Sequence, residues 1–177
     1  MKARFLCALM VVWVLASPSA RADFFRYTAE RSLIRLQVMA ASDSDADQAV
    51  KLRVRDAVRA VAVAAATGAD SPKAAYDRLR ASLPALTRAA RAVDSSASVE
   101  LMTTRFPPRL YGETLVPAGR YRAVRITLGE GVGRNWWCVV YPDLCAIDSQ
   151  SAAALGSGAP VRFYSGLMKW LRGGEGA

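Results

Sequence analysis

After an apolar leader, the pattern of hydrophobic and polar positions begins with an alternating stretch at residues 32–41. Its even positions from 34 to 40 are all apolar, while the positions between them mix apolar and polar side chains. Because successive side chains on a strand point to opposite faces, this alternation predicts a β-strand with one buried face. A polar turn at 42–45 follows, and Ser44 with Asp47 resembles the capping box that starts a helix.

Three helices are predicted after this turn. Apolar side chains recur at helical spacing over residues 50–65, and charged side chains form a row on another face. Thr-Gly at 67–68 ends this helix. Serine followed by proline, at 71–72 and again within 82–84, starts a second and a third helix, because serine caps a helix and proline suits its first turn. The third helix is predicted to run to about residue 93.

From residue 98 the pattern changes to strands, which we predict at 99–106, 121–128 and 136–141. One N-terminal strand, two to three helices and then several strands indicate a single α+β domain over residues 23–148. We expect the later strands to form an antiparallel β-meander that contains a disulfide-capable hairpin.

Two terminal segments flank this domain. Residues 1–22 have a basic start, an apolar run of 12 residues and an Ala-Arg-Ala cleavage pattern, which together predict a secretory signal peptide. The run spans about 18 Å as a helix, short of the roughly 30 Å core of a bilayer, although an uncleaved anchor is the alternative. Residues 149–159 predict a flexible link. Within 149–177, the apolar spacing from Phe163 to Leu171 predicts a short C-terminal amphipathic helix.

The positive charge of the chain limits the kinds of partner that it can attract. The formal net charge is +9, and the leader contributes three of these charges through Lys2, Arg4 and Arg21, which leaves +6 for the mature chain. An exported basic protein is attracted to anionic lipid, to anionic wall polymer or to acidic loops of a membrane protein, and we expect no nucleic-acid partner outside the cell. The alternative is that most arginines only solvate helix faces.

The chain contains no histidine. This removes the commonest general base, the commonest zinc ligand and the Ser-His and Cys-His nucleophile pairs. We therefore expect a protein that is not an enzyme, with no catalytic residues, no metal and no cofactor.

Residues 129–145 hold the most distinctive chemistry, with two adjacent tryptophans and two cysteines seven positions apart. If the chain turns at 141–142, Cys138 faces Cys145 across a hairpin, and facing positions are close enough for a disulfide. Such a bond would stabilise the domain by roughly 2.5 kcal/mol in the chain-entropy model. An exported chain favours the disulfide, and two free buried thiols are the alternative.

The same segment predicts a recognition surface. Trp136 and Trp137 are neighbours on a strand and should point to opposite faces, so one is core and the other is either covered or exposed for binding. Gly129, Gly131 and Gly133 lack the spacing and the following helix of a dinucleotide fingerprint. We interpret them as a loop with positive φ angles or a close approach to a partner.

Motifs from residue 34 to residue 148 resemble one known family, the stage II sporulation protein R family of endospore-forming bacteria. The residues that carry the resemblance are Ile34-Arg35-Leu36, Ser42-Asp43-Ser44, Asp47-Gln48, Lys51, Arg55-Asp56-Ala57-Val58, Phe106-Pro107, Tyr111-Gly112, Pro117-Ala118-Gly119, Tyr121, Asn135-Trp136-Trp137-Cys138, Pro142, Leu144 and Cys145. The Asn-Trp-Trp-Cys block is the most specific. Gln37, Ala41 and Pro108-Arg109 depart from the pattern of similar proteins.

The resemblance implies a signalling protein rather than a catalyst. Such a protein is made in the forespore and secreted across the membrane, into the intermembrane space between forespore and mother cell. There it activates a membrane-embedded aspartic protease, which in turn processes the precursor of a mother-cell sigma factor. Weak contact with an anionic membrane surface is compatible with the positive charge.

Three hypotheses follow from these patterns. The leading one is an activating ligand, whose expected partner-binding residues are Asp43, Asp47, Gly131, Gly133, Asn135, Trp136 and Trp137. The second is an exported enzyme with Cys138 as nucleophile, which requires a free thiol. The third is a wall- or lipid-binding module that acts through its basic face.

Overall fold

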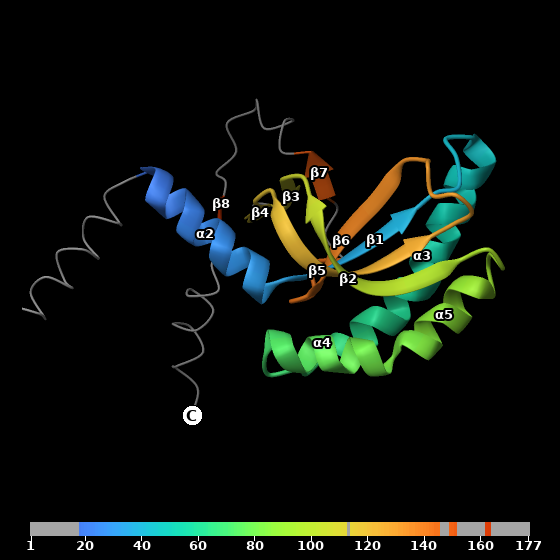
Figure 1. The fold of residues 1–177 in the computed structure, drawn as a ribbon, viewed down its shortest axis with the longest axis horizontal. Helices are drawn as coiled ribbons and strands as arrows, with labels where there is room; N and C mark the ends of the chain where they lie inside the picture. The colour runs from blue at the N-terminus through green and yellow to red at the C-terminus, as the bar shows by residue number, and fades with distance from the viewer. Residues whose placement is uncertain (1–17, 113, 146–148, 152–161, 164–177) are drawn as a thin grey trace, which may run out of the picture.

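A computed structural model describes residues 18–112, 114–145, 149–151 and 162–163 (Figure 1). The elements form an α+β arrangement, in which three consecutive helices follow β1 and the later strands come after them. In chain order the elements are α2 (Pro18–Ser32), β1 (Ile34–Met39), α3 (Asp45–Ala66), α4 (Pro72–Ala81), α5 (Leu83–Arg91), β2 (Ser98–Phe106), β3 (Arg109–Tyr111), β4 (Thr114–Val116), β5 (Gly119–Thr127), β6 (Asn135–Tyr141), β7 (Ser149–Ser151) and β8 (Arg162–Phe163).

The main sheet has the strand order β2-β5-β1-β6. β1 pairs in parallel with β5 and antiparallel with β6, while β2 pairs antiparallel with β5. The predicted antiparallel meander is therefore wrong, because β1 lies between the two strands expected to be neighbours. Among the strands whose burial is described, β1 is the most completely buried, and the centre of the sheet is the position that buries it.

The three predicted helices are confirmed as α3, α4 and α5, and Figure 1 shows them together on one side of the main sheet. Their buried aliphatic side chains, such as Val54, Val58, Leu79 and Leu86, form one core with those of the sheet. Ser71 caps α4 as predicted, through a 3.1 Å hydrogen bond from the Ala74 N–H. Ser82 makes no such cap for α5.

A smaller sheet of order β7-β3-β4-β8 lies over part of the opposite face of the main sheet, where Tyr111 of β3 contacts Arg35 (Figure 1). The sequence pattern did not reveal the β3-β4 hairpin, whose strands have only three residues each. On this second face Arg35 and Gln37 are buried along with the apolar positions of β1: Arg35 contacts Tyr111 of β3, and Gln37 is hydrogen-bonded to Asn135 and Arg125. The prediction of a single buried face for β1 is therefore wrong.

Helix α2 precedes β1 and was not predicted. It runs through the expected cleavage site at 20–22, and residues 1–17 of the predicted leader lie outside the described residues. The Glu30 carboxylate accepts the Arg120 N–H of β5 at 2.7 Å, and the Arg122 guanidinium donates to the Arg31 carbonyl at 2.8 Å, so α2 is held against β5. Among the helices that the structure describes, none combines the length and apolar character needed to cross a bilayer.

The C-terminal predictions fall mostly outside the described residues. Within the segment expected to be a flexible link, Ser149–Ser151 forms β7 and pairs with β3. Phe163, expected to open the final helix, instead pairs with Leu115 at the end of β8. The rest of the predicted link and helix, 152–161 and 164–177, is not described.

Candidate functional site

Two segments far apart in sequence meet at one end of the main sheet. The turn after β1 and the loop between β5 and β6, residues 42–47 and 129–135, together form what we call the tip. The Gly133 N–H donates to the Ala40 carbonyl at 3.0 Å, and a Cβ atom at Gly133 would lie 2.2 Å from the Ser42 carbonyl oxygen. Glycine is therefore required at 133 because the two backbones touch.

The glycine loop has the positive φ angles that the sequence predicts. Gly129 has φ of 52° and Gly131 has φ of 68°, and a Cβ atom at Gly131 would lie 2.5 Å from the Thr127 side chain. The close backbone approach expected at these glycines is made inside the molecule, at Gly133. These glycines shape the tip and present no side chain to a partner.

Hydrogen bonds fasten the loop to the turn. The Arg134 N–H donates to the Asp43 carboxylate at 2.7 Å, and the Arg134 guanidinium lies 3.5 Å from the same oxygen. From α3, the Lys51 ammonium donates to the Arg134 carbonyl at 3.1 Å, and the Gln48 amide donates to the Ser42 carbonyl at 2.9 Å. Burial, reinforced by nearby Arg134, lowers the pKa of Lys51.

The predicted cap of the long helix is present in a modified form. The Ser44 hydroxyl accepts the Asp47 N–H at 3.2 Å, as in a capping box. In a capping box the Asp47 carboxylate would accept the Ser44 N–H directly. Here the Ser42 hydroxyl lies between them: it accepts the Ser44 N–H and donates to the Asp47 carboxylate. Asp47 is therefore part of the framework of the tip, whereas the Asp43 side chain is largely exposed.

The most exposed apolar side chain of the tip was missed by the sequence prediction. Val132, between Gly131 and Gly133, is 72% exposed, the highest value among the large hydrophobic side chains described. Exposed Glu130 and Arg134 lie close to it in the loop. A lone valine within a glycine-rich loop is a signal that could have identified it.

The side chain of Asn135 forms a hydrogen bond inside the protein. Its side-chain oxygen accepts the Gln37 amide at 2.7 Å, and Gln37 in turn accepts the Arg125 guanidinium at 3.1 Å. Arg125 also donates to the Thr104 hydroxyl at 2.8 Å. This chain of hydrogen bonds crosses all four strands of the main sheet, so Asn135 holds β6 in register.

The two tryptophans point to opposite faces of β6, as predicted, and both are half-buried. Trp136 faces α3, where the Arg55 guanidinium lies 5.5 Å from its ring. Trp137 lies on the other face, 6.4 Å from the ring of Phe106 and 4.5 Å from the guanidinium of Arg109. Neither indole is fully core or fully exposed, and each has an arginine stacked near it.

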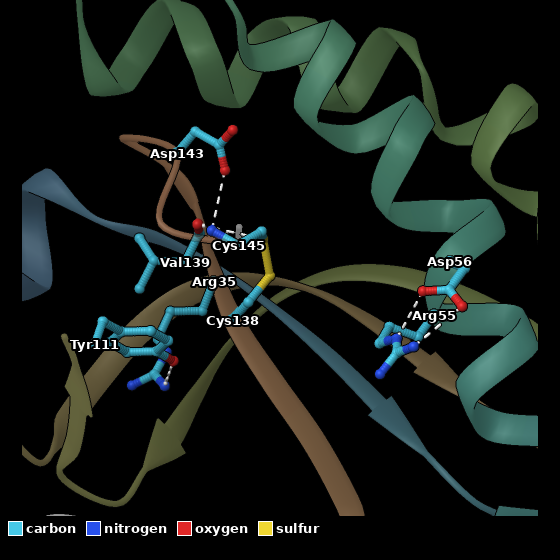
Figure 2. Close-up of a disulfide and its surroundings, with 8 residues drawn as sticks. All are labelled: Arg35, Arg55, Asp56, Tyr111, Cys138, Val139, Asp143 and Cys145. Atoms are coloured by element: carbon cyan, nitrogen blue, oxygen red, sulfur yellow. Dashed lines mark hydrogen bonds and ion pairs between the residues drawn. A yellow bond between two sulfur atoms is a disulfide. The ribbon is translucent and has the colours of Figure 1, made fainter. Parts of the chain in front are cut away.

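Cys138 and Cys145 form the predicted disulfide, with Cα atoms 5.0 Å apart (Figure 2). The hairpin expected to bring them together is absent. After Tyr141 the chain turns, and the Leu144 N–H donates to the Val139 carbonyl at 3.0 Å. Cys145, which lies in this turn and not on a second strand, is thereby placed next to Cys138. Neither sulfur is a free thiol in this form, and no metal-binding group of three or more His, Cys, Asp or Glu occurs among the residues described.

Arg35, on the central strand, is fully buried beneath the smaller sheet. It donates to the Tyr111 hydroxyl at 2.9 Å (Figure 2), and its guanidinium lies 4.3 Å from the Phe106 ring and 5.4 Å from the Tyr121 ring. Its Nε and Nη1 atoms have no hydrogen-bond partner in the part of the chain that the structure describes. Burial lowers the pKa of Arg35 and raises the pKa values of Tyr111 and Tyr121.

Comparison with known proteins gives a specific result. The profile of the family described as stage II sporulation protein R matches residues 30–151. A protein of that description from Bacillus subtilis (strain 168) is 39% identical over 128 residues, which cover 69% of this chain and 57% of the relative. The chain thus spans less than two thirds of that relative's length. No solved structure gives a significant match.

Proposed function

Because this chain belongs to the stage II sporulation protein R family, we propose that it is an exported signalling protein of sporulation. It acts in the space between forespore and mother cell, where it activates a membrane-embedded aspartic protease. That protease then processes the precursor of a mother-cell sigma factor. The chain binds its receptor and performs no chemistry on it.

The tip is the observation that carries this proposal. It presents exposed Val132 between charged side chains, on a base fixed by the Gly133 contact and the Asp43–Arg134 hydrogen bond. A rigid surface loses little conformational entropy on binding, and an exposed apolar side chain at its apex supplies desolvation energy. This combination suits recognition of another protein.

The disulfide supports the choice of a ligand over a cysteine enzyme. A nucleophilic cysteine acts as a thiolate, whereas Cys138 is bonded to Cys145 and buried. Removal of both cysteines should therefore leave activation intact wherever the variant stays folded.

The experiment is reconstituted processing of the sigma factor precursor by the membrane protease, with the purified chain added. We expect Val132→Glu to lower activation about tenfold or more, the effect of losing one central contact. Trp136→Ala and Trp137→Ala test the half-buried indoles beside the tip. Each variant is first checked for folding by circular dichroism.

Ala64→Glu is the matched control, because it adds the same charge at an exposed position near the far end of α3. It lies about 28 Å along the helix from the first residue of α3. Full activation by folded Val132→Glu, Trp136→Ala and Trp137→Ala alike would show that the tip is not the receptor-binding surface. Equal loss with Ala64→Glu would point to a general charge effect.

A further inference from the structure

A basic groove lies at the other end of the main sheet, between α2 and the strands β2 and β5. Its main hollow has a volume of about 440 Å³ and is lined by Arg26, Glu30, Arg105 and Arg120. A second hollow of about 420 Å³ shares Glu30 and Arg120 and adds Arg31 and Arg122. We call the two hollows together the arginine groove.

Arg105 and Arg120 form the centre of this groove. They are direct register partners on β2 and β5, so their side chains leave the sheet side by side. Like charges directly opposite one another on neighbouring strands destabilise a sheet. Within the described residues neither guanidinium makes a hydrogen bond or an ion pair, and both side chains are exposed. The fold therefore retains a like-charged pair, and no ion pair to either guanidinium occurs among the described residues.

The groove also contains an acidic side chain, Glu30, which binds the backbone of β5. One Glu30 oxygen accepts the Arg120 N–H at 2.7 Å, and Gly119 lies so close that a Cβ atom there would be 2.5 Å from that oxygen. Arg26 is paired with exposed Asp23 on its own helix. Glu30 shows that a carboxylate fits between α2 and β5, yet it leaves Arg105 and Arg120 unpaired.

The spacing of the arginines favours a linear ligand. Arg120 and Arg122 are two positions apart on one face of β5, so their Cα atoms are about 6.7 Å apart. One Arg122 nitrogen donates to the Arg31 carbonyl, and the other donors of its guanidinium have no hydrogen-bond partner among the described residues. Alternate side chains of an extended peptide repeat at the same distance. The planar guanidinium fork suits a carboxylate through two parallel hydrogen bonds, and a concave track suits a chain better than a flat lipid surface.

We propose that the arginine groove binds an extended, carboxylate-rich segment of another protein, with Arg105 and Arg120 as the principal ligands. This inference goes beyond the proposed function, which places receptor recognition at the tip on the opposite end of β5. It holds whether or not the tip is the activating contact.

The test measures binding of a fluorescent hexaglutamate peptide to the purified chain by anisotropy. We expect the double variant Arg105→Gln/Arg120→Gln to bind at least about tenfold more weakly, because it loses charge-assisted hydrogen bonds. The same variant should melt about 1–2 °C higher, since the like-charge pair is removed. A rise in Tm together with a loss of binding separates a ligand site from a structural role.

Arg53→Gln/Arg88→Gln is the matched control, because it removes two exposed arginines from α3 and α5 and gives the same net charge. It should bind the peptide within about twofold of wild type. Equal weakening by both double variants would overturn the proposal in favour of general charge attraction. Binding to phosphatidylglycerol vesicles but not to hexaglutamate, lost in the groove variant, would make the groove a lipid site and also overturn it.

The outcome is independent of the receptor test. If Val132→Glu abolishes precursor processing but leaves hexaglutamate binding unchanged, both proposals stand. If hexaglutamate fails to bind while Val132→Glu still abolishes processing, the groove proposal fails and the tip proposal survives.

Discussion

The tip and the arginine groove occupy opposite ends of the same strand, β5, and they are built in opposite ways. At the tip, backbone contacts and hydrogen bonds join the loop and the turn into one unit. In the groove, Arg105 and Arg120 lie side by side, and neither guanidinium makes a hydrogen bond or an ion pair with the described residues. The tip is stabilised by its own internal contacts. The groove instead retains a repulsion between two arginines, which a bound anionic ligand would reduce.

The largest expected effect comes from disrupting the backbone contact of the tip, which tests whether the tip is rigid. Gly133→Ala places a Cβ atom 2.2 Å from the Ser42 carbonyl oxygen, so one of the two segments must move. We expect the free energy of unfolding to fall by about 3 kcal/mol, the upper range for overpacking. Urea denaturation measures this change.

Val132→Ala, next to it in the same loop, is the control and should change stability by less than about 0.5 kcal/mol, because the valine is 72% exposed. A Gly133→Ala protein as stable as wild type would mean that the loop adapts and that the tip is not rigid.

The second prediction concerns the disulfide, which closes the end of β6 away from the tip. Cys138→Ala with Cys145→Ala should lower the free energy of unfolding by about 2.5 kcal/mol, as expected for a short closed loop. Below its melting temperature the double variant should still activate the protease through an intact tip. Loss of activation in a folded double variant would contradict this and would favour a chemical role for Cys138.

The third prediction is a pH dependence at the start of β5. Burial raises the pKa of Tyr121 above its usual value of 10.0, so the folded protein keeps this hydroxyl neutral where the unfolded chain ionises. The unfolded state then binds fewer protons, and the contribution of Tyr121 to stability falls as the pH rises above about 10. Near pH 7 its hydroxyl is bonded to the Pro117 carbonyl at 2.7 Å.

Tyr121→Phe should therefore be about 1 kcal/mol less stable than wild type at pH 7, because it lacks this hydrogen bond. The difference should shrink as the pH is raised from 10 to 11, and chemical denaturation across this range measures it. A difference that stays constant would show that Tyr121 ionises equally in both states.

The sequence predicted local structure well and tertiary pairing poorly, for a physical reason. The 3.6-residue period and the Ser44 cap are local features, so α3 begins and ends close to where it was expected. Strand order depends on how much apolar surface each strand buries in the folded sheet. Polar Arg35 and Gln37 alternate with apolar residues in β1, so the sequence did not indicate that this strand is covered on both faces. A charged side chain in the pattern suggested solvent, but tertiary packing placed Arg35 among aromatic rings.

The same distinction holds for the candidate site. The predicted residues of the turn and the glycine loop do meet, but Asp47, Gly133 and Asn135 are occupied inside the molecule. Val132 was visible as an isolated apolar residue and was overlooked. Arg105 and Arg120 are 15 positions apart in sequence, and only the register of β2 and β5 brings them together.

The smallest expected effect sharpens the comparison most, because it measures the repulsion in the groove directly. Arg105→Gln and Arg120→Gln should each raise the free energy of unfolding by about 0.5 kcal/mol, and the double variant should gain little more, since either change removes the pair. A double-mutant cycle from urea denaturation at low salt gives this coupling free energy. Added salt should reduce it, because the side chains are exposed. A coupling of zero would mean that the two guanidinium groups avoid each other in solution, and the groove would then lose the feature that distinguishes it from an ordinary basic surface.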